Sequence, residues 1–561
     1  MRHFCGSISL LILLFFSNFI YSQELNNNHF SNDKYYQTCL LWGFLKYHHP
    51  KVSDGEFNWD SVCIDLIEQV EKTNNQQELD DILLKFIAQY PYKKQKTNKE
   101  AENYFYKNED YKWINDEKFA AEIKNALNEI KDNSKPNDFY AKINTIGRQL
   151  DFKNEKGFAS FDPQIKSHRL LFLFNFWNAI NYWNVNKYLF DDNWLTILPQ
   201  FTNDFIKCTS SLDFEIVKSR LISSLNDSHS FYLSKEISDK LFKFRPAFLV
   251  KNVNDSLFVQ YIPNKDLAEK DGVEIGDVIF KINNDDIKSL IEKRLKPLFS
   301  SSNSNFLKRW SHYLLWNQTD SLNVSILKRD GKIIKKRIQL YDQIKDSLAE
   351  GVSTYPTEKY KKIDSVVGYI NLGYITKSEL ENAFDLFKDT KGLIIDLRNY
   401  PKNINEQDVA KFLYPKKKEF IKILFPLKNK PSLCEYDGKG TIDFIKDPFL
   451  AGSANDNYYK GKVILLVDSK TQSKAEYIGM AIQGAPNCIT IGEQTAGSVM
   501  NVVEYTMSDF TKIYFTGLGA FYPDGTEVQR KGLKIDFQVR LNAKNIDFDL
   551  YIKKATNLIE N

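Results

Sequence analysis

Residues 466–484, LVDSKTQSKAEYIGMAIQG, join an apolar run to a polar turn and then to an amphipathic segment. The apolar residues before the turn predict a buried strand. The apolar positions after the turn recur at helical spacing, namely Ala475, Tyr477, Ile478, Met480, Ala481 and Ile482. Ser473 therefore lies where a turn opens into a helix. A serine at this place either caps the helix or acts as a nucleophile beside converging backbone N–H groups.

Strands and helices alternate on both sides of this stretch, from residue 346 to the end of the chain. Four stretches are typical of strands, namely VVGYINLGYI, KGLIIDLRNYP, KVILLVD and CITIGEQTAG. Two others are typical of helices, namely KSELENAFDLFKDT and KAEYIGMAIQGAP. Such alternation predicts a mainly parallel sheet with helices on its faces. Because sites collect at the carboxyl ends of parallel strands, the loops DLRNYPKN and DSKTQSKAE are the candidates for chemistry.

Residues 240–342 have the pattern of a small, all-β domain. Within them AEKDGVEIGDVIFKINNDDI places Gly272, Gly276 and Asp277 in a turn that leads into a short apolar strand and a hairpin. This segment resembles the corresponding turn and strand of PDZ domains, which bind extended C-terminal peptides by β-augmentation. The resemblance implies a PDZ-like domain over residues 236–345 that either captures peptide or serves only as a spacer.

Residues 23–235 are rich in Leu, Phe, Trp and Lys at helical spacing, which predicts a helical domain. LWGFLKYHHPKVSDGEFNWDSVCIDLI aligns with FWNAINYWNVNKYLFDDNWLTILPQFT. Trp42 then matches Trp177 and Trp59 matches Trp194 at one offset (177 − 42 = 194 − 59 = 135). A repeated helical unit is the economical interpretation, and chance similarity in an aromatic-rich region is the alternative.

The first residues, MRHFCGSISLLILLFFSNFIYSQ, combine Arg2 with a short apolar run and small residues near Ser22. This pattern predicts a secretory signal peptide over residues 1–22, and no later run is long enough to cross a bilayer. We therefore expect an exported protein, periplasmic or secreted, without a stable membrane span. The net charge of +4 over 561 residues, with Lys and Asn spread along the chain, gives no sign of nucleic acid binding.

Four motifs that follow the PDZ-like segment resemble those of the C-terminal-processing and tricorn-like serine peptidases. In chain order they are GLIIDLRNYP, TQSKAEY, IGEQTAG and FYPDGTEVQRKGLKIDFQV. The resemblance implies a crotonase/ClpP-like α/β catalytic domain over residues 346–561 of an α+β multidomain chain. It implies Ser473, in Ser-x-Ala-Glu, as the nucleophile. It also implies backbone oxyanion donors at Lys474 and in the loop after Asp-Leu-Arg, where Lys402 and Asn403 replace the two glycines of the family.

The serine needs a base. One branch of the family uses a lysine, but Ser498 occupies that position here, and no lysine occurs between Lys474 and Lys512. The tricorn-like branch uses a histidine in a Leu-x-Asp-x-His pattern, which LISSLNDSHSFYL matches at His229. A histidine with an ordinary pKa of about 6.5 suits general-base catalysis at neutral pH.

A third group should orient the imidazole and balance its charge. The resemblance implies Ser228, beside the histidine, and a downstream glutamate. TEVQRKG offers Glu527 and Gln529 for the second role. The register counted back from Gly532 favours Gln529, whereas Glu527 requires a shifted loop.

These motifs predict an exported serine endopeptidase that hydrolyses extended polypeptides through Ser473 and His229. No cofactor is implied, and the adjacent His48 and His49 diverge on a helix or strand, so no metal site is expected. Two alternatives stay open. The missing glycines and lysine suggest a non-catalytic peptide- or lipid-binding relative, and the serine site is also compatible with a small ester or amide substrate.

Overall fold

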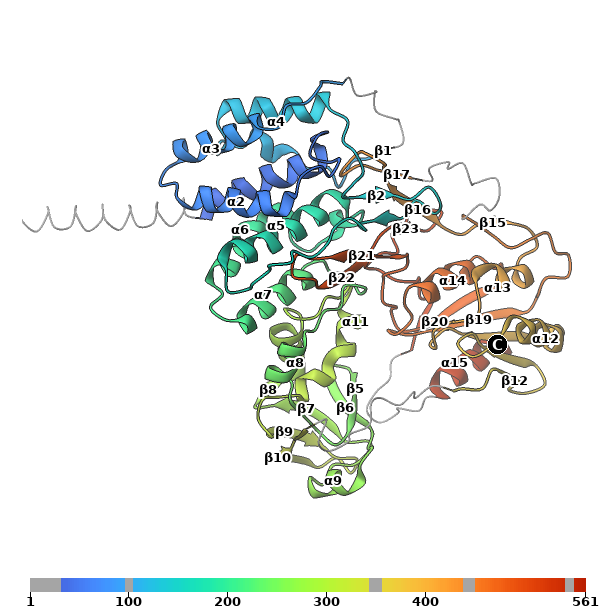
Figure 1. Ribbon diagram of the computed structural model, residues 1–561. Coiled ribbons are helices and arrows are strands. Elements are labelled where there is room, and N and C mark those ends of the chain that lie inside the picture. The colour runs from blue at the N-terminus through green and yellow to red at the C-terminus, as the bar shows by residue number, and fades with distance from the viewer. Residues whose placement is uncertain (1–31, 96–103, 343–355, 437–448, 540–548) are drawn as a thin grey trace, which may run out of the picture.

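A computed structural model describes residues 32–95, 104–342, 356–436, 449–539 and 549–561. The predicted signal peptide lies outside these residues. Figure 1 shows a helical region, a small β-rich region and an α/β region, so the chain is a mixed α/β multidomain protein. Within the described part of the chain, no helix combines the length and apolar character needed to cross a membrane.

Two units of three helices build most of the N-terminal region. The first contains a helix over residues 32–48, α2 (Trp59–Glu71) and α3 (Gln76–Ala88), and the second contains α5 (Lys166–Trp183), α6 (Trp194–Lys207) and α7 (Ser211–Ser223). The helix α4 (Ala121–Asn133) lies between them in the chain. The starts of α2 and α6 are separated by the same offset as those of α3 and α7 (194 − 59 = 211 − 76 = 135).

Each unit contains two tryptophans that donate their indole N–H groups to each other's backbone carbonyl. The Nε1–O distances are 3.2 and 3.3 Å for Trp42 with Trp59, and 2.9 and 3.0 Å for Trp177 with Trp194. The rings of each pair are stacked, with centroids 6.2 and 6.3 Å apart. Because a buried indole N–H without a partner is costly, these reciprocal bonds allow both rings to be core residues.

The β-rich region is an antiparallel sheet in the order β10-β9-β7-β6-β5, with β8 beside β7. Its strands are β5 (Leu249–Val253), β6 (Ser256–Tyr261), β7 (Val278–Ile282), β8 (Asp285–Asp286), β9 (Ser321–Leu327) and β10 (Ile333–Gln339). The helix α8 (Lys235–Leu241) precedes the sheet, and α9 (Lys265–Lys270) follows β6. The strand β5 forms one edge of the sheet.

The prediction of an all-β domain is wrong for residues 287–315. These residues form α10 (Ile287–Leu290), η3 (Ile291–Leu295), α11 (Ser304–Leu307) and η4 (Lys308–Leu315). The apolar side chains at positions 287, 290, 291 and 295 are buried in the core of this region. Their spacing suits a helix, and the strand-like residues on both sides obscured it in the sequence.

The α/β region contains a six-stranded sheet in the order β12-β13-β14-β19-β20-β24, parallel except for β12, as the alternation predicted. Its strands are β12 (Tyr360–Lys362), β13 (Val367–Asn371), β14 (Gly392–Asp396), β19 (Lys462–Val467), β20 (Cys488–Gly492) and β24 (Phe537–Gln538).

Helices cover both faces of this sheet. One face packs against α12 (Lys377–Phe387), α13 (Glu406–Leu413) and α14 (Lys474–Gln483), and the other against α15 (Asp549–Glu560). The side chains of β19 point alternately to the two faces of the sheet. Leu465 therefore lies in the core with α14, and Ile464 lies in the core with α15. Burial on both faces explains why β19 is apolar throughout.

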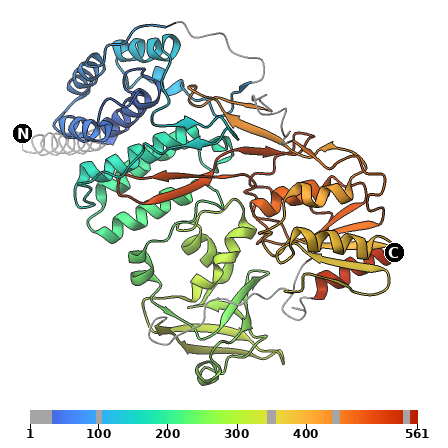
Figure 2. The ribbon, with the colours of Figure 1, turned by 45° about the vertical axis from the view of Figure 1, so that its right-hand side comes forward.

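A hairpin of β21 (Val502–Thr506) and β22 (Lys512–Thr516) extends from the α/β region and lies along the helical region (Figure 2). Tyr505 and Phe515 are buried in the core of the helices. Near the tip of the hairpin, Asp509 forms a buried ion pair of 2.7 Å with Lys218 of α7. A further sheet joins the same two regions through β1 (Tyr104–Phe105), β17 (Cys434–Tyr436), β16 (Lys422–Pro426) and β23 (Gly519–Phe521).

Candidate active site

Three parallel strands of the α/β sheet end side by side, and each leads into a polar loop. Asp396 of β14 pairs with Leu466 of β19, and β20 continues the parallel pairing on the other side of β19. Hydrogen bonds connect the loops, from Thr471 Oγ1 to Leu397 O at 3.2 Å and from the Ala496 N–H to Thr471 O at 3.0 Å. The loops singled out in the sequence therefore meet at one edge of the sheet.

Ser473 occupies the turn between β19 and α14. Its backbone angles are φ 59° and ψ −123°, a conformation that is rare for a residue with a Cβ atom. Such strain costs about 1–3 kcal/mol and is found mainly at functional sites. The Ser473 N–H donates to Ser498 O at 3.0 Å, so the residue at the position of the family's lysine is a direct neighbour of Ser473.

The carboxyl group of Glu476, in the first turn of α14, supports this turn. Glu476 is fully buried and accepts hydrogen bonds from Thr495 Oγ1 at 2.5 Å and from the N–H groups of Gly497, Ser498 and Ser473 at 2.7, 3.0 and 3.3 Å. Burial raises the pKa of Glu476 to about 7, although these donors act in the opposite direction. The glutamate of Ser-x-Ala-Glu thus holds the loops on which the serine lies.

His229 lies in the turn after α7, and its ring is held through Nδ1. Nδ1 is 2.8 Å from Thr516 Oγ1, and Thr516 Oγ1 is 2.9 Å from Asp227 Oδ1. A carboxylate only accepts hydrogen bonds, so the Thr516 hydroxyl donates to Asp227 and accepts the N–H of Nδ1. This order leaves Nε2 as the unprotonated nitrogen of a neutral ring.

Asp227 also fixes the backbone around the ring. It accepts the Thr516 N–H at 2.6 Å and the His229 N–H at 3.0 Å, while its Oδ1 is 3.9 Å from Nδ1 of His229. Burial lowers the pKa of His229, and the charge of Asp227 raises it in part. Nε2 is buried and has no hydrogen-bond partner in the described part of the chain. The ring of His229 is thus a neutral imidazole held through one nitrogen.

The turns of His229 and Ser473 lie side by side, although the two residues are 244 positions apart (473 − 229 = 244). Gln472 Nε2 donates to Ser228 O and to Ser498 Oγ, both at 3.1 Å. The first of these bonds joins immediate neighbours of the two predicted catalytic residues. Between the side chains of Ser473 and His229 themselves, both of which the structure describes, there is no hydrogen bond.

Of the residues considered for the third group, Gln529 contacts Thr516, whose hydroxyl holds the ring of His229. Gln529 is buried, and its Nε2 lies 3.4 Å from Thr516 Oγ1. The Ser228 hydroxyl donates instead to the backbone carbonyl of residue 496 at 3.1 Å. Glu527 forms an ion pair of 2.9 Å with Lys531. The structure therefore places Gln529 nearer to the ring than Glu527, and Ser228 faces the neighbouring loop.

Sequence reasoning missed Asp227 and Thr516 as parts of the site. Asp227 had a signal, because it is the aspartate of the Leu-x-Asp-x-His pattern. Thr516 has no local signal, because only the docking of the β21–β22 hairpin brings it to the ring.

The predicted oxyanion donors lie on two segments that meet at the start of α14. Lys474 is the first residue of that helix, where N–H groups have no acceptor in a preceding turn. Its Nζ lies 3.3 Å from the backbone oxygen of Lys402, and both Lys402 and Asn403 are exposed. A buried ion pair of 2.6 Å between Asp396 and Arg398 fixes the beginning of their loop. The loop without the family's glycines thus still lies beside α14.

Residues 366–539 match the model of peptidase family S41. The chain carries a peptidase family S41 domain. The assignment makes this domain a serine-type peptidase, that is, a hydrolase. The matched segment contains Ser473, Glu476 and Thr516, whereas His229 and Asp227 precede it.

The chain also matches several solved structures. Mature CPAF complexed with lactacystin matches with a TM-score of 0.51 and 12% identity, covering 69% of this chain and 96% of that chain. A photosystem II D1 C-terminal processing protease has a TM-score of 0.34 at 14% identity (68% and 95% covered), and the tricorn protease 0.32 at 16% (71% and 37%). At 12% sequence identity, the likeness to CPAF shows that the two chains share a fold. Among curated proteins, no match to the chain was found.

Proposed function

We propose that the chain is an exported serine endopeptidase that hydrolyses peptide bonds in extended polypeptides, with Ser473 as the nucleophile and His229 as the general base. One observation carries the proposal. The ring of His229 is held through Nδ1 by Thr516, its Nε2 is buried without a hydrogen bond to any described residue, and its turn is bonded to Gln472, next to Ser473. A neutral imidazole in this tautomer has its basic nitrogen available for a serine hydroxyl.

In the acylation step, His229 Nε2 takes the proton of the Ser473 hydroxyl while Oγ attacks the carbonyl carbon of the substrate. The resulting imidazolium is stabilised by Asp227 through Thr516. The same proton then passes from Nε2 to the leaving amine as the peptide bond breaks. The structure has no hydrogen bond between the side chains of Ser473 and His229, both of which it describes, and catalytic hydrogen bonds of this kind commonly form only in the substrate complex.

The negative charge on the carbonyl oxygen requires donors in this mechanism. The Lys474 N–H at the start of α14 is one, and the N–H groups of Lys402 and Asn403 are the candidates for the second. Removing one such donor costs about 3–4 kcal/mol in other serine peptidases. Water then attacks the acyl group, its proton moves to Nε2, and Ser473 is released with that proton.

Export and substrate class rest on different observations. The N-terminal pattern MRHFCGSISLLILLFF supports passage through a secretory route. The edge strand β5 beside the S41 domain supports an extended polypeptide as substrate, because such a strand pairs with extended chains. The PDZ resemblance of this region remains part of the proposal.

A fluorophosphonate probe on the mature chain tests the nucleophile. We expect covalent labelling of Ser473, loss of labelling in Ser473→Ala, and labelling slower by about 100-fold or more in His229→Gln. Ser469→Ala, in the same loop, is the matched control and should be labelled like the parent chain. Casein hydrolysis should follow the same order.

Two outcomes contradict the proposal. If Ser473→Ala hydrolyses casein as fast as the parent, Ser473 is not the nucleophile. If a correctly folded parent chain, judged by circular dichroism, is neither labelled nor active, it is a peptide- or lipid-binding relative. Turnover of short acyl esters without turnover of casein would favour a small substrate.

A further inference from the structure

Residues 300–305 of the β-rich region contact the turn that carries the proposed base. They follow η3 and include the first two residues of α11. Ser300 Oγ accepts the Asp227 N–H at 3.1 Å. Ser302 forms two bonds with Ser228, because its Oγ accepts the Ser228 N–H at 2.9 Å and its own N–H donates to Ser228 Oγ at 3.0 Å. This segment therefore holds the two residues that directly precede the base.

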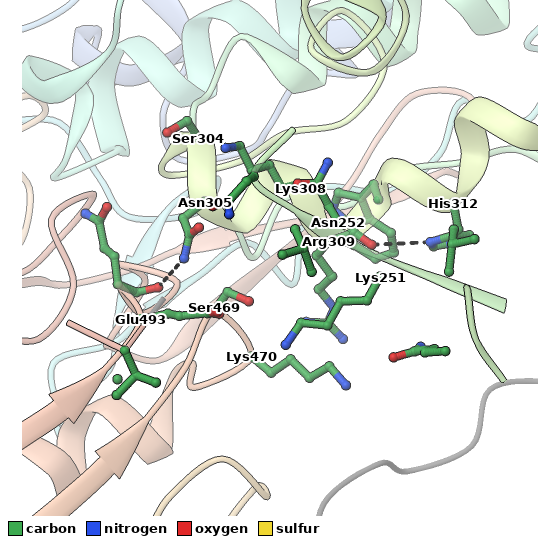
Figure 3. A pocket seen from close by; sticks show the side chains of 18 of the residues that line it. Lys251, Asn252, Ser304, Asn305, Lys308, Arg309, His312, Ser469, Lys470 and Glu493 are labelled. Atoms are coloured by element: carbon green, nitrogen blue, oxygen red, sulfur yellow. Dashed lines mark hydrogen bonds between the residues drawn. The ribbon is translucent and has the colours of Figure 1, made fainter. Parts of the chain in front are cut away.

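The same segment also bonds the loop after β20, residues 494–498, which accepts the N–H of the proposed nucleophile. Asn303 Nδ2 lies 2.9 and 3.1 Å from the backbone oxygens at positions 495 and 496. Asn305 Nδ2 donates to Gln494 O at 2.9 Å, a bond drawn as a dashed line beside Asn305 in Figure 3. One short segment of the β-rich region thus joins the base turn to the loop beside the nucleophile.

Ser228 is the residue at which these contacts meet. Besides its two bonds with Ser302, its hydroxyl donates to Ala496 O at 3.1 Å and its carbonyl accepts Gln472 Nε2 at 3.1 Å. Ser228 and Ser302 are both buried, so a partner that is removed is not readily replaced by water. The resemblance implied Ser228 as a partner of the imidazole. Its contacts instead suit a residue that holds the base turn in place.

Proton transfer from Ser473 to His229 depends on how closely their turns approach. The Thr516 hydroxyl fixes the tautomer of the ring, whereas the contacts between the turns fix the distance of the ring from the serine. A reacting group that is misplaced by about 1 Å can slow catalysis by about 100-fold. Because residues 300–305 bond both the base turn and the loop beside the nucleophile, a change in this segment should alter the rate of the chemical step.

We propose that Ser302 and Asn303 are positioning residues that keep His229 within reach of the Ser473 hydroxyl. The proposal rests on the proposed function, because it concerns the base of that site. It gives the β-rich region a role in the chemical step, beside the peptide capture or spacing that its sequence suggests. Neither residue contacts the substrate in this role, so their loss lowers kcat and changes KM little.

A fluorophosphonate probe measures this effect without a bound peptide, because labelling requires only attack by Ser473. In the mature chain, Ser302→Ala leaves the Ser228 N–H without its acceptor. Asn303→Asp keeps the acceptor of the Phe306 N–H but turns a carboxylate oxygen toward backbone carbonyls. We expect each variant to slow labelling by about 10- to 100-fold. The kcat of casein hydrolysis should fall similarly, with KM changed by less than about threefold.

Two matched controls lie elsewhere in the β-rich region. Ser311 is buried, and its Oγ accepts Asn252 Nδ2 at 3.1 Å. Asn264 caps α9 as Asn303 caps α11. Among the described residues, neither Ser311 nor Asn264 forms a hydrogen bond with the base turn or with residues 494–498. Ser311→Ala and Asn264→Asp should be labelled at the rate of the parent chain, and circular dichroism checks the fold of all four variants.

A double-mutant cycle separates positioning from a general loss of structure. If Ser302 acts through His229, then Ser302→Ala should not slow labelling further once His229→Gln has removed the base. A distorted nucleophile or a distorted oxyanion site would instead slow labelling by the same factor in both backgrounds.

Two results would overturn the inference: labelling of Ser302→Ala and Asn303→Asp at the parent rate, or equal slowing by Ser302→Ala with and without His229. The two proposals fail in different ways. If the parent chain is labelled at Ser473 and both variants match it, the positioning role alone is rejected. If the folded parent chain is not labelled at all, the peptidase is rejected, and the positioning role is rejected with it.

Discussion

Asp227 and His229 are connected through the hydroxyl of Thr516, which is 2.9 Å from Asp227 Oδ1 and 2.8 Å from His229 Nδ1. Their direct separation, 3.9 Å from Oδ1 to Nδ1, is too long for a hydrogen bond. A hydroxyl both donates and accepts, so it fixes the tautomer of the ring as a direct carboxylate would. In the proposed mechanism this bridge takes the place that an aspartate or glutamate holds in other catalytic triads.

Replacing Thr516 by valine keeps the shape of the side chain and removes the bridge. We expect kcat/KM to fall by roughly 10- to 1,000-fold, less than the ~10⁴-fold loss that follows removal of the charged partner itself in a triad. Thr516→Ser retains the hydroxyl and should restore most of the activity. Peptidase assays of both variants, with melting temperatures as a check on folding, make the measurement. Equal activity of Thr516→Val and the parent would show that the bridge has no catalytic role.

The pH dependence of kcat/KM should report His229. A general base must be neutral, so activity falls as the pH drops through its pKa. Burial lowers that pKa, and the acid limb should therefore have its midpoint below the ordinary value of about 6.5. Because the charge of Asp227 raises the pKa, Asp227→Asn should move the midpoint to still lower pH. A midpoint above 6.5, or an upward shift in Asp227→Asn, would contradict the assignment of the base.

Glu476 should make stability depend on pH in a defined direction. The pKa of Glu476 in the folded chain, about 7, lies above its ordinary value of 4.5. Between pH 4.5 and 7 the folded state therefore keeps a proton that the unfolded state has released. The contribution of Glu476 to the free energy of unfolding therefore decreases as the pH rises from 4.5 to 7. Glu476→Gln removes this dependence but places an NH₂ group against backbone donors, at a cost of about 1–3 kcal/mol. Urea unfolding should show a smaller loss in the variant at pH 8 than at pH 5.

The local sequence predicts the strands β13, β14, β19 and β20 and the helices α12 and α14, since strand and helix periods there are clear, but it gave no prediction for α13, α15 or the β21–β22 hairpin. The turn at Ser473 was predictable for the same reason, because a buried strand, a polar turn and an amphipathic helix follow one another within residues 466–484. The helices at 287–315 were not predicted, because short helical turns between strands give a weak periodic signal.

Long-range contacts explain the other omissions. Thr516 lies 287 residues from His229 in the chain, and only the packing of Tyr505 and Phe515 among the helices brings its strand there. A motif identifies residues that share a turn, whereas a relay assembled from separate segments requires the fold.

The ion pair between Lys218 and Asp509 should be needed for both stability and activity. The Lys218 side chain is almost fully buried and pairs with Asp509 at 2.7 Å and with Glu215 at 2.6 Å. Lys218→Met leaves these carboxylates without their cation, a change that costs about 3–5 kcal/mol for a buried pair. Because Asp509 belongs to the hairpin that carries Thr516, the variant should also lose activity at temperatures where it remains folded.

The exposed pair of Lys235 and Asp239 provides the control for this prediction. Lys235→Met should change the free energy of unfolding by no more than about 0.5 kcal/mol, because exposed pairs within a helix contribute little. Thermal unfolding measures the effect of each variant on stability, and peptidase assays below the melting temperature measure its effect on activity. If Lys218→Met is destabilised but fully active below its melting temperature, the hairpin holds the domains together without positioning Thr516 at the ring of His229. A joint loss supports the view that the helical region, through this hairpin, keeps the base in place.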